Sequence, residues 1–258
     1  MAELRNQTAY QGRVRDQAAI DQGLRSYMLR VYNYMAVAIG VTGVAALLAA
    51  NLATTNDPTA AVAQMANGTM LTAFGHAIFA SPLKWVVMLA PLGFVFLFSS
   101  MVNRVSVSTG QFMLYAFGAL MGLSLSSVFL VFTGESITQT FFVTAAAFAG
   151  LSLYGYTTKR DLSAFGTFLV MGLIGLIIAS VVNIFLQSSG LQFVISVAGV
   201  LIFAGLTAWD TQRIKAIYDQ VAHDETLMGR TAIMGALSLY LNFINLFMFL
   251  LQFMGNRE

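Results

Sequence analysis

The chain has 258 residues, of which 58% are hydrophobic and only 9% are charged, and its mean hydropathy is +0.76. Soluble domains carry about 25% charged residues, so this composition excludes a soluble globular protein. Cysteine is absent, which excludes disulfides, thiolate metal sites and thiol nucleophiles. Several apolar runs reach the roughly 20 residues that a helix needs to cross a bilayer, so the sequence predicts an all-α membrane protein.

The first 26 residues differ in composition from the rest of the chain. Residues 1–26 are polar, carry interleaved acids and arginines, and show no apolar periodicity. We interpret them as a solvated cytoplasmic tail with no nucleic-acid partner, because the acids offset the arginines and aromatic residues are nearly absent. No linker or composition break divides residues 27–258, which we interpret as one membrane domain.

Seven apolar segments follow in chain order, and we expect each of them to cross the membrane as a helix. A long outer loop is expected after the first segment, and a polar loop over residues 211–230 before the last. The approximate bounds of the seven segments are 32–52, 84–102, 111–131, 137–156, 162–186, 191–209 and 232–254.

The distribution of Lys and Arg predicts the orientation. An odd number of spans places the two termini on opposite sides, and only Lys84 and Arg257 fall on the side of the C-terminus. The positive-inside rule then predicts a cytoplasmic N-terminus and a C-terminus outside. The cations on the N-terminal side are Arg5, Arg13, Arg15, Arg25, Arg30, Arg104, Lys159, Arg160, Arg213, Lys215 and Arg230.

The third apolar segment carries a stripe of small residues, Gly118, Gly122 and Ser126, spaced four positions apart. Such a stripe lets two helix backbones approach closely in lipid. We expect it to serve packing within the bundle rather than homodimerisation, because seven helices in one bundle need such contacts in any case.

Catalytic constellations are absent from the sequence. There is no Ser/His/Asp arrangement at membrane depth, no metalloprotease motif and no phosphate-binding glycine loop, so we expect neither an enzyme nor a cofactor. We interpret His223, Asp224 and Glu225 as a solvated group in the last polar loop rather than a metal site.

The last two apolar segments contain polar residues that lipid does not tolerate. Asp210 ends the sixth segment, and Asn242 and Asn245 lie within the seventh. A carboxylate at bilayer depth costs a few kcal/mol unless it is paired, which makes Asp210 a candidate functional residue. At 1.5 Å per residue, Asp210 lies about 28 Å from Leu191, near the inner edge of the core, whereas Asn242 lies near mid-bilayer. This arithmetic leaves open whether the two residues meet or Asp210 only ends its helix.

Four stretches of the chain resemble a known family. They are the residues 155–163 (GYTTKRDLS), 182–185 (VNIF), 209–215 (WDTQRIK) and 237–247 (LSLYLNFINLF). Together they are similar to the signature of the transmembrane Bax-inhibitor-motif family, and the resemblance covers about residues 25–256. It implies a fold in which six helices surround the C-terminal one.

The resemblance also implies a site. Family members commonly place acids at the positions of Asp210 and Asn242, where the pair shares a proton, and they act as pH-sensitive calcium leak channels. An arginine at the position of Arg104 acts as a latch on the acids. This chain departs from the pattern at Asn242, which leaves one titrating proton and one charge fewer for a divalent cation.

We therefore expect a pH-sensitive cation leak channel for Ca²⁺ or H⁺, or a stress-protective membrane regulator, with Asp210 as its gate and Asn242, Asn245 and Arg104 on the ion or proton pathway. The expected setting is membrane lipid, in a bacterial inner membrane. One alternative is a non-conducting interaction protein that modulates membrane quality control, for instance a membrane-anchored protease. The other is a proton-coupled transporter of small solutes.

Overall fold

The computed structural model describes the backbone of residues 2–65 and 68–256, and the side chains from Gln22 onward within those ranges. The Lys and Arg count that predicted the orientation includes four arginines whose side chains the structure does not describe. Arg257 lies outside the described residues, and so do the side chains of Arg5, Arg13 and Arg15.

Seven helices in the described ranges are long and apolar enough to cross a membrane, which confirms the predicted all-α membrane fold. A short antiparallel hairpin, β1 with β2, and the single turn α2 follow α1, and a π-helical turn over His76–Ala80 leads into α3. A 3-10 turn over Ser126–Leu130 continues α4. The elements are α1 (Ala2–Ala53), β1 (Ala63–Gln64), β2 (Met70–Leu71), α2 (Ala73–Gly75), α3 (Leu83–Met101), α4 (Val107–Leu125), α5 (Gly134–Thr157), α6 (Ser163–Leu186), α7 (Ser189–Val221) and α8 (Glu225–Met254).

The prediction of a polar loop over residues 211–230 is wrong. The helix α7 continues to Val221 and α8 begins at Glu225, so only Ala222, His223 and Asp224 connect them. The polar composition of this stretch marks where the helices leave the apolar core, not where they end. With 33 residues, α7 is about 50 Å long, which exceeds a hydrocarbon core of about 30 Å.

Side chains at the helix starts satisfy backbone N–H groups that have no partner within the helix. Each capping oxygen accepts a hydrogen bond from an N–H two or three residues further on. The N-caps that do so at the long helices are Ser106 for α4, Thr133 for α5, Ser188 for α7 and Asp224 for α8. These caps fix where four of the helices begin.

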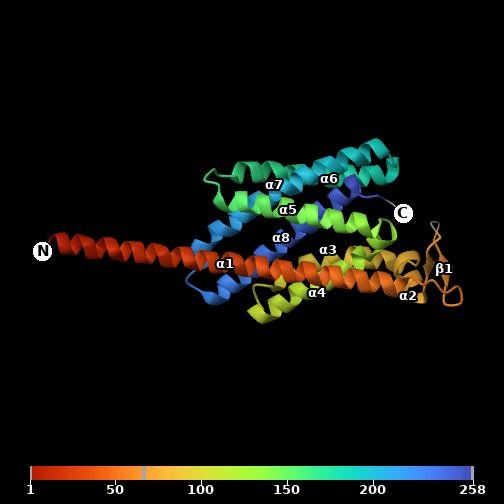
Figure 1. Ribbon diagram of the computed structural model, residues 1–258, viewed down its shortest axis with the longest axis horizontal. Coiled ribbons are helices and arrows are strands. Elements are labelled where there is room, and N and C mark those ends of the chain that lie inside the picture. Colours follow the sequence, from red (N-terminus) through yellow and green to blue (C-terminus); the bar gives the residue numbers. More distant parts are fainter. Residues whose placement is uncertain (1, 66–67, 257–258) are drawn as a thin grey trace.

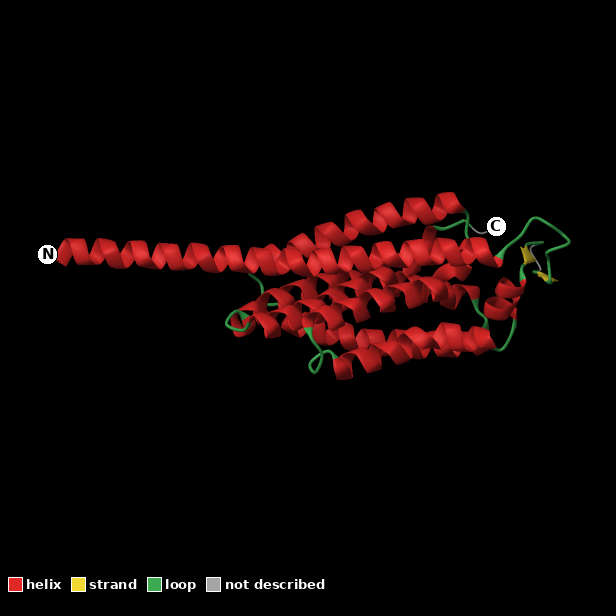
Figure 2. Cartoon of the chain, turned by 90° about the horizontal axis from the view of Figure 1, so that it is seen from below, coloured by secondary structure: helices red, strands yellow, loops and turns green. Residues whose placement is uncertain are grey.

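The long helices alternate in direction, and the two ends of the chain lie at opposite ends of the bundle (Figure 1). The helix α1 extends well beyond the bundle on the N-terminal side (Figures 1 and 2). It is continuous through residue 26, so the expected boundary between tail and membrane domain does not coincide with a break in secondary structure.

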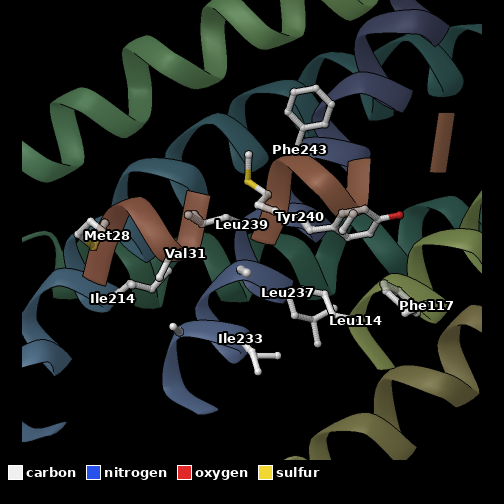
Figure 3. Close-up of a cluster of buried hydrophobic side chains, with 14 of the residues drawn as sticks. Met28, Val31, Leu114, Phe117, Ile214, Ile233, Leu237, Leu239, Tyr240 and Phe243 are labelled. Carbon is white, nitrogen blue, oxygen red and sulfur yellow. The ribbon is translucent and has the colours of Figure 1, made fainter. Parts of the chain in front are cut away.

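The helix α8 is the most buried of the long helices and packs against α1, α4, α5 and α7. Its side chains Ile233, Leu237 and Tyr240 meet Val31 of α1 and Leu114 of α4 in one apolar cluster (Figure 3). The helices α3 and α6 are the least buried and pack mainly on α4 and α7. That all six other helices surround α8 therefore stays a prediction.

The small-residue stripe of α4 lies against α1. A Cβ placed at Gly118 would lie 2.8 Å from the carbonyl oxygen of Ala38, and one at Gly122 would overlap the backbone of Thr42 and Ala46. Ser126 at the end of the stripe is fully buried. Because lipid gives helices no hydrophobic reason to associate, this close backbone approach is what holds α1 and α4 together.

We expect Gly122→Val to destabilise the bundle by about 1–3 kcal/mol, because the added methyl groups meet backbone atoms that cannot move aside. Thermal unfolding in detergent measures the effect. The matched control is Gly150→Val on α5, where the structure leaves open space around the glycine. Equal stability of the two variants would contradict the packing described here.

Candidate functional site

The sixth and seventh spans meet at a buried acid–amide pair. Asn242 Nδ2 donates to Asp210 Oδ2 over 2.8 Å, and the exposed fractions of the two residues are 5% and 7%. The other carboxylate oxygen, Oδ1, lies 2.9 Å from Arg213 Nη2, an ion pair whose angles do not make it a hydrogen bond. The extra turns of α7 and α8 beyond the predicted spans are what allow Asp210 and Asn242 to lie at the same depth.

Arg213, one turn beyond Asp210 on α7, is the cation of this site. Its side chain is 46% exposed, and its guanidinium also lies over the ring of Trp209, 4.9 Å from the ring centroid. An ion pair with one wet partner is worth little by itself, but here the carboxylate is buried and depends on it.

The structure does not bring Arg104 to Asp210. Arg104 lies exposed in the turn between α3 and α4, and within the described residues the ion pair of Asp210 is with Arg213. The expected Arg104–Asp210 contact is thus not present in this conformation. The sequence signal for Arg213 was its spacing of three residues from Asp210, which places both on one helix face.

A cavity of about 680 Å³, here called the Asp210 cavity, adjoins the pair. Asp210, Arg213, Ser238, Asn242 and Asn245 line its polar part. Its remaining walls are apolar side chains of α6, α7 and α8, with one residue from α3: Leu92, Val170, Leu173, Leu176, Ile177, Val181, Ile184, Phe203, Leu206, Trp209, Leu241 and Phe249, besides Ser180. Asn245 donates to the carbonyl of Leu241 on its own helix.

The residues around Asp210 on α7 attach that helix to its neighbours. Thr211 donates to the carbonyl of Thr207 and therefore accepts from the hydroxyl of Ser152 on α5. Ser152 in turn accepts from the hydroxyl of Tyr32 on α1. Asp210 faces the Asp210 cavity from this turn, together with Trp209 and Arg213.

Further contacts tie α7 to the turn between α5 and α6. Gln212 accepts from the N–H of Leu162 and donates to the carbonyl of Arg160, and Lys215 donates to the carbonyl of Tyr156. These bonds satisfy backbone groups at the end of one helix and the start of the next. The Gly155–Ser163 and Trp209–Lys215 motifs are therefore two halves of one interface.

Two glycines let α5 and α6 approach α7. A Cβ at Gly155 would overlap the backbone of Ala208, and one at Gly166 would overlap the ring of Trp209. Neither clash can be relieved cheaply, because a backbone and a ring held under Arg213 are both fixed. Close packing on both sides thus fixes the rotation of α7 that turns Asp210 toward α8.

Two acidic residues near the α5–α6 and α7–α8 turns have structural partners. Asp224 accepts from the N–H groups of Thr226 and Leu227 and so caps α8. Hydrogen bonds from the hydroxyl and the backbone N–H of Ser163 hold the pKa of the exposed Asp161 carboxyl below its usual value. Within the described ranges, no group of three or more His, Asp and Glu side chains is arranged to hold a metal ion.

Together the fold and this site define a class: an all-α integral membrane protein of seven spans with a buried carboxylate held by an amide and an arginine. Residues 24–258 match the sequence model of the family described as "Inhibitor of apoptosis-promoting Bax1". The chain belongs to this Bax inhibitor family, which confirms the resemblance found in its motifs.

Relatives with similar sequences cover nearly the whole chain. The chain is 45% identical to "Uncharacterized protein RP147" of Rickettsia prowazekii, over 92% of either protein. It is 44% identical to "Inner membrane protein YbhL" of Escherichia coli, over 92% of this chain and 94% of that protein. An uncharacterized protein of Caulobacter vibrioides is 46% identical over 93% of this chain and 92% of its own length.

We expect Asn242→Ala to lower the free energy of unfolding by about 1–3 kcal/mol, because it leaves the buried Asp210 carboxylate without its amide donor. The matched control is Asn245→Ala on the same helix, which removes a bond only within α8 and should cost about 0.5 kcal/mol or less. Thermal unfolding in detergent compares the two. Equal losses would mean that the Asp210–Asn242 bond adds no stability.

Proposed function

We propose that this protein is a cation leak pathway of a bacterial inner membrane, carrying Ca²⁺ or H⁺, and that Asp210 is its gate. The observation that carries the proposal is the 2.8 Å hydrogen bond between Asn242 and Asp210 in the wall of the Asp210 cavity. A buried ionisable residue within spanning helices is the usual mark of an ion or proton pathway. An inner membrane relative in Escherichia coli supports the location.

The three side chains of the site can exchange partners without unfolding. A proton on Asp210 cancels its charge and releases Arg213, whereas the amide of Asn242 can bond to a neutral or a charged carboxyl. A cation that enters the cavity competes with Arg213 for the same carboxylate. Either event frees the guanidinium, whose half-exposed position lets it move into water. A stress-protective regulator would use this same switch.

We expect Asp210→Asn to abolish the pH dependence of cation flux, because Asp210 is the titrating carboxylate of the site and its amide replacement carries no exchangeable charge. Ca²⁺ and H⁺ fluxes into proteoliposomes, followed with trapped indicator dyes from acid to neutral pH, measure the effect. Asp219→Asn is the matched control, since Asp219 lies exposed further along the same helix.

The arginines add a second comparison to this assay. Arg213→Gln should change the pH profile, because it removes the ion-pair partner of Asp210, whereas Arg104→Gln should leave the profile unchanged. The opposite result would mean that a different conformation, with Arg104 at the acid, governs flux. An unchanged profile in Asp210→Asn would contradict the proposed gate.

We further propose that the N-terminus is cytoplasmic and the C-terminus outside, on the strength of the Lys and Arg distribution. Because the chain has no cysteine, single cysteines report the side directly. Cysteines replacing Ser188 and Gly255 should react with a membrane-impermeant reagent added to intact cells, and one replacing Ala222 should react only after the membrane is opened. Labelling of the Ala222 position from outside would reverse the assignment.

The Asp210 cavity also favours a second candidate, the proton-coupled transport of a small solute. Its volume of about 680 Å³ lies within the range of small-molecule sites, and Ser238, Asn242 and Asn245 offer polar contacts in an apolar wall. Solute counterflow in proteoliposomes that show no net ion leak would support this function over the channel.

The extension of α1 favours the third candidate, a regulator that acts through a partner such as a membrane-anchored protease. The helix continues from the bundle to Ala2 as one element, so it offers a surface outside the membrane (Figure 1). If removal of residues 2–21 abolished a cellular phenotype while reconstituted flux stayed unchanged, the regulator would be the better description.

A further inference from the structure

The Asp210 cavity is a groove that opens to the side of the bundle. Its deepest wall is buried and includes Phe203 of α7 and Asn242 of α8. Its rim is exposed and is formed by Leu92 on α3 and by α6, which pack mainly on α4 and on α7, respectively. Because these helices span the membrane, an opening between them faces lipid chains. The exposed rim residues of α6 are Ile177, Val181 and Ile184.

The groove has the length and the surface that an acyl chain requires. Its lining on α6 runs from Val170 to Ile184, about 21 Å at 1.5 Å per residue. One leaflet contributes about 15 Å to a hydrocarbon core of about 30 Å, so an extended acyl chain fits along the groove. Ser180 is the one polar residue of α6 in this lining, and it donates to the carbonyl of Leu176 on its own helix.

At Ile184 the groove reaches a chain of uncharged amides that joins three helices. Asn183 on α6 donates to Gln192 on α7 over 3.0 Å, and Gln192 donates to Gln252 on α8 over 2.8 Å. The residues that line the small pocket around these amides include no charged side chain. A charged group on an occupant of the groove is therefore drawn to the other end, where Arg213 lies.

Arg213 can bind an anion at that end. Within the described residues, its guanidinium interacts with the Asp210 carboxylate and with the ring of Trp209, and it is half-exposed. The contact with Asp210 is an ion pair through Nη2 alone. A guanidinium has five N–H donors in a planar fork, so most of them remain for a phosphate group at the membrane surface.

Two further cations lie close to this end of the groove. Gln212, the neighbour of Arg213, donates to the carbonyl of Arg160 over 2.7 Å and so joins α7 to the turn between α5 and α6. That turn exposes both Lys159 and Arg160. Its acid, Asp161, accepts a backbone hydrogen bond at the start of α6. Cations beside spanning helices attract anionic lipid headgroups.

We propose that the Asp210 cavity is a binding groove for an anionic phospholipid, with one acyl chain along α6 and the phosphate headgroup on Arg213. The apolar wall holds the chain, and the cation selects the headgroup and the orientation. This site goes beyond the leak pathway, because lipid binding needs no ion flux and either proposal can fail without the other.

The two tryptophans of the chain provide the test. Trp209 lines the groove, and in the Trp85→Phe protein it is the sole tryptophan. The protein is reconstituted in phosphatidylcholine vesicles with a small share of lipid whose acyl chains are brominated near their carboxyl ends, since bromine quenches tryptophan on contact. Brominated phosphatidylglycerol should quench Trp209 with about fivefold higher apparent affinity than brominated phosphatidylcholine. Equal affinities would overturn the proposal.

Trp85 is the matched control for general attraction of anionic lipid to a cation. It lies exposed at the start of α3, outside the groove lining, with the ammonium of Lys84 5.6 Å from its ring centroid. In the Trp209→Phe protein, Trp85 should show a clearly smaller preference for phosphatidylglycerol. A preference at Trp85 as large as that at Trp209 would mean that a surface cation alone accounts for the effect, and would overturn the groove.

Variants in the Trp85→Phe background separate the two halves of the site. Arg213→Gln should remove the preference, and Arg213→Lys should retain most of it. Ser180→Phe fills the apolar half of the groove and should lower the preference even though Arg213 is intact. Its matched control is Ile178→Phe, because Ile178 is exposed on α6 outside the groove lining. A full preference in a folded Ser180→Phe protein would show that the groove holds no acyl chain, and would overturn the proposal.

Discussion

The hydrogen bond from Asn242 to Asp210 joins α8 to α7 at a depth where the carboxylate could not remain without a partner. A buried carboxylate needs donors, and lipid supplies none, so the helices must deliver them. Asn242 comes from α8 and Arg213 from α7, and both depend on the rotation and depth of α7. The packing around α7 is therefore the condition for the site.

That packing explains the recognisable motifs of the chain. Thr211 reaches a hydroxyl on α5, Gln212 and Lys215 satisfy carbonyl and N–H groups at the α5–α6 turn, and Trp209 covers Gly166. One turn of helix thus contacts α5, α6 and the turn between them while leaving a single carboxylate toward the cavity. A motif that looks functional as a whole contains two residues of the site's chemistry, Asp210 and Arg213, and several that position them.

The sequence predicted the fold well because hydropathy reports burial in lipid directly, and all seven spans were found. It misplaced the ends of α7 and α8, since helices that project into water have the composition of loops. The same error made the depths of Asp210 and Asn242 disagree, and only the family resemblance suggested that they meet. Arg213 was counted as a topology charge, and the expected latch Arg104 lies elsewhere in this conformation. The chain of amides that joins Asn183, Gln192 and Gln252 was missed because Gln252 lies 60 residues from Gln192 in the sequence.

The short link between α7 and α8 has a mechanical consequence. Only Ala222, His223 and Asp224 connect the two helices, and Asp224 caps the second of them. Such a hairpin cannot slip by a helical turn along its own axis, because three residues provide no slack. Whatever parts Asp210 from Asn242 must therefore be a twist, a tilt or a change of rotamer. The two helices can separate sideways at the ends far from this link, but they cannot shift lengthwise past one another.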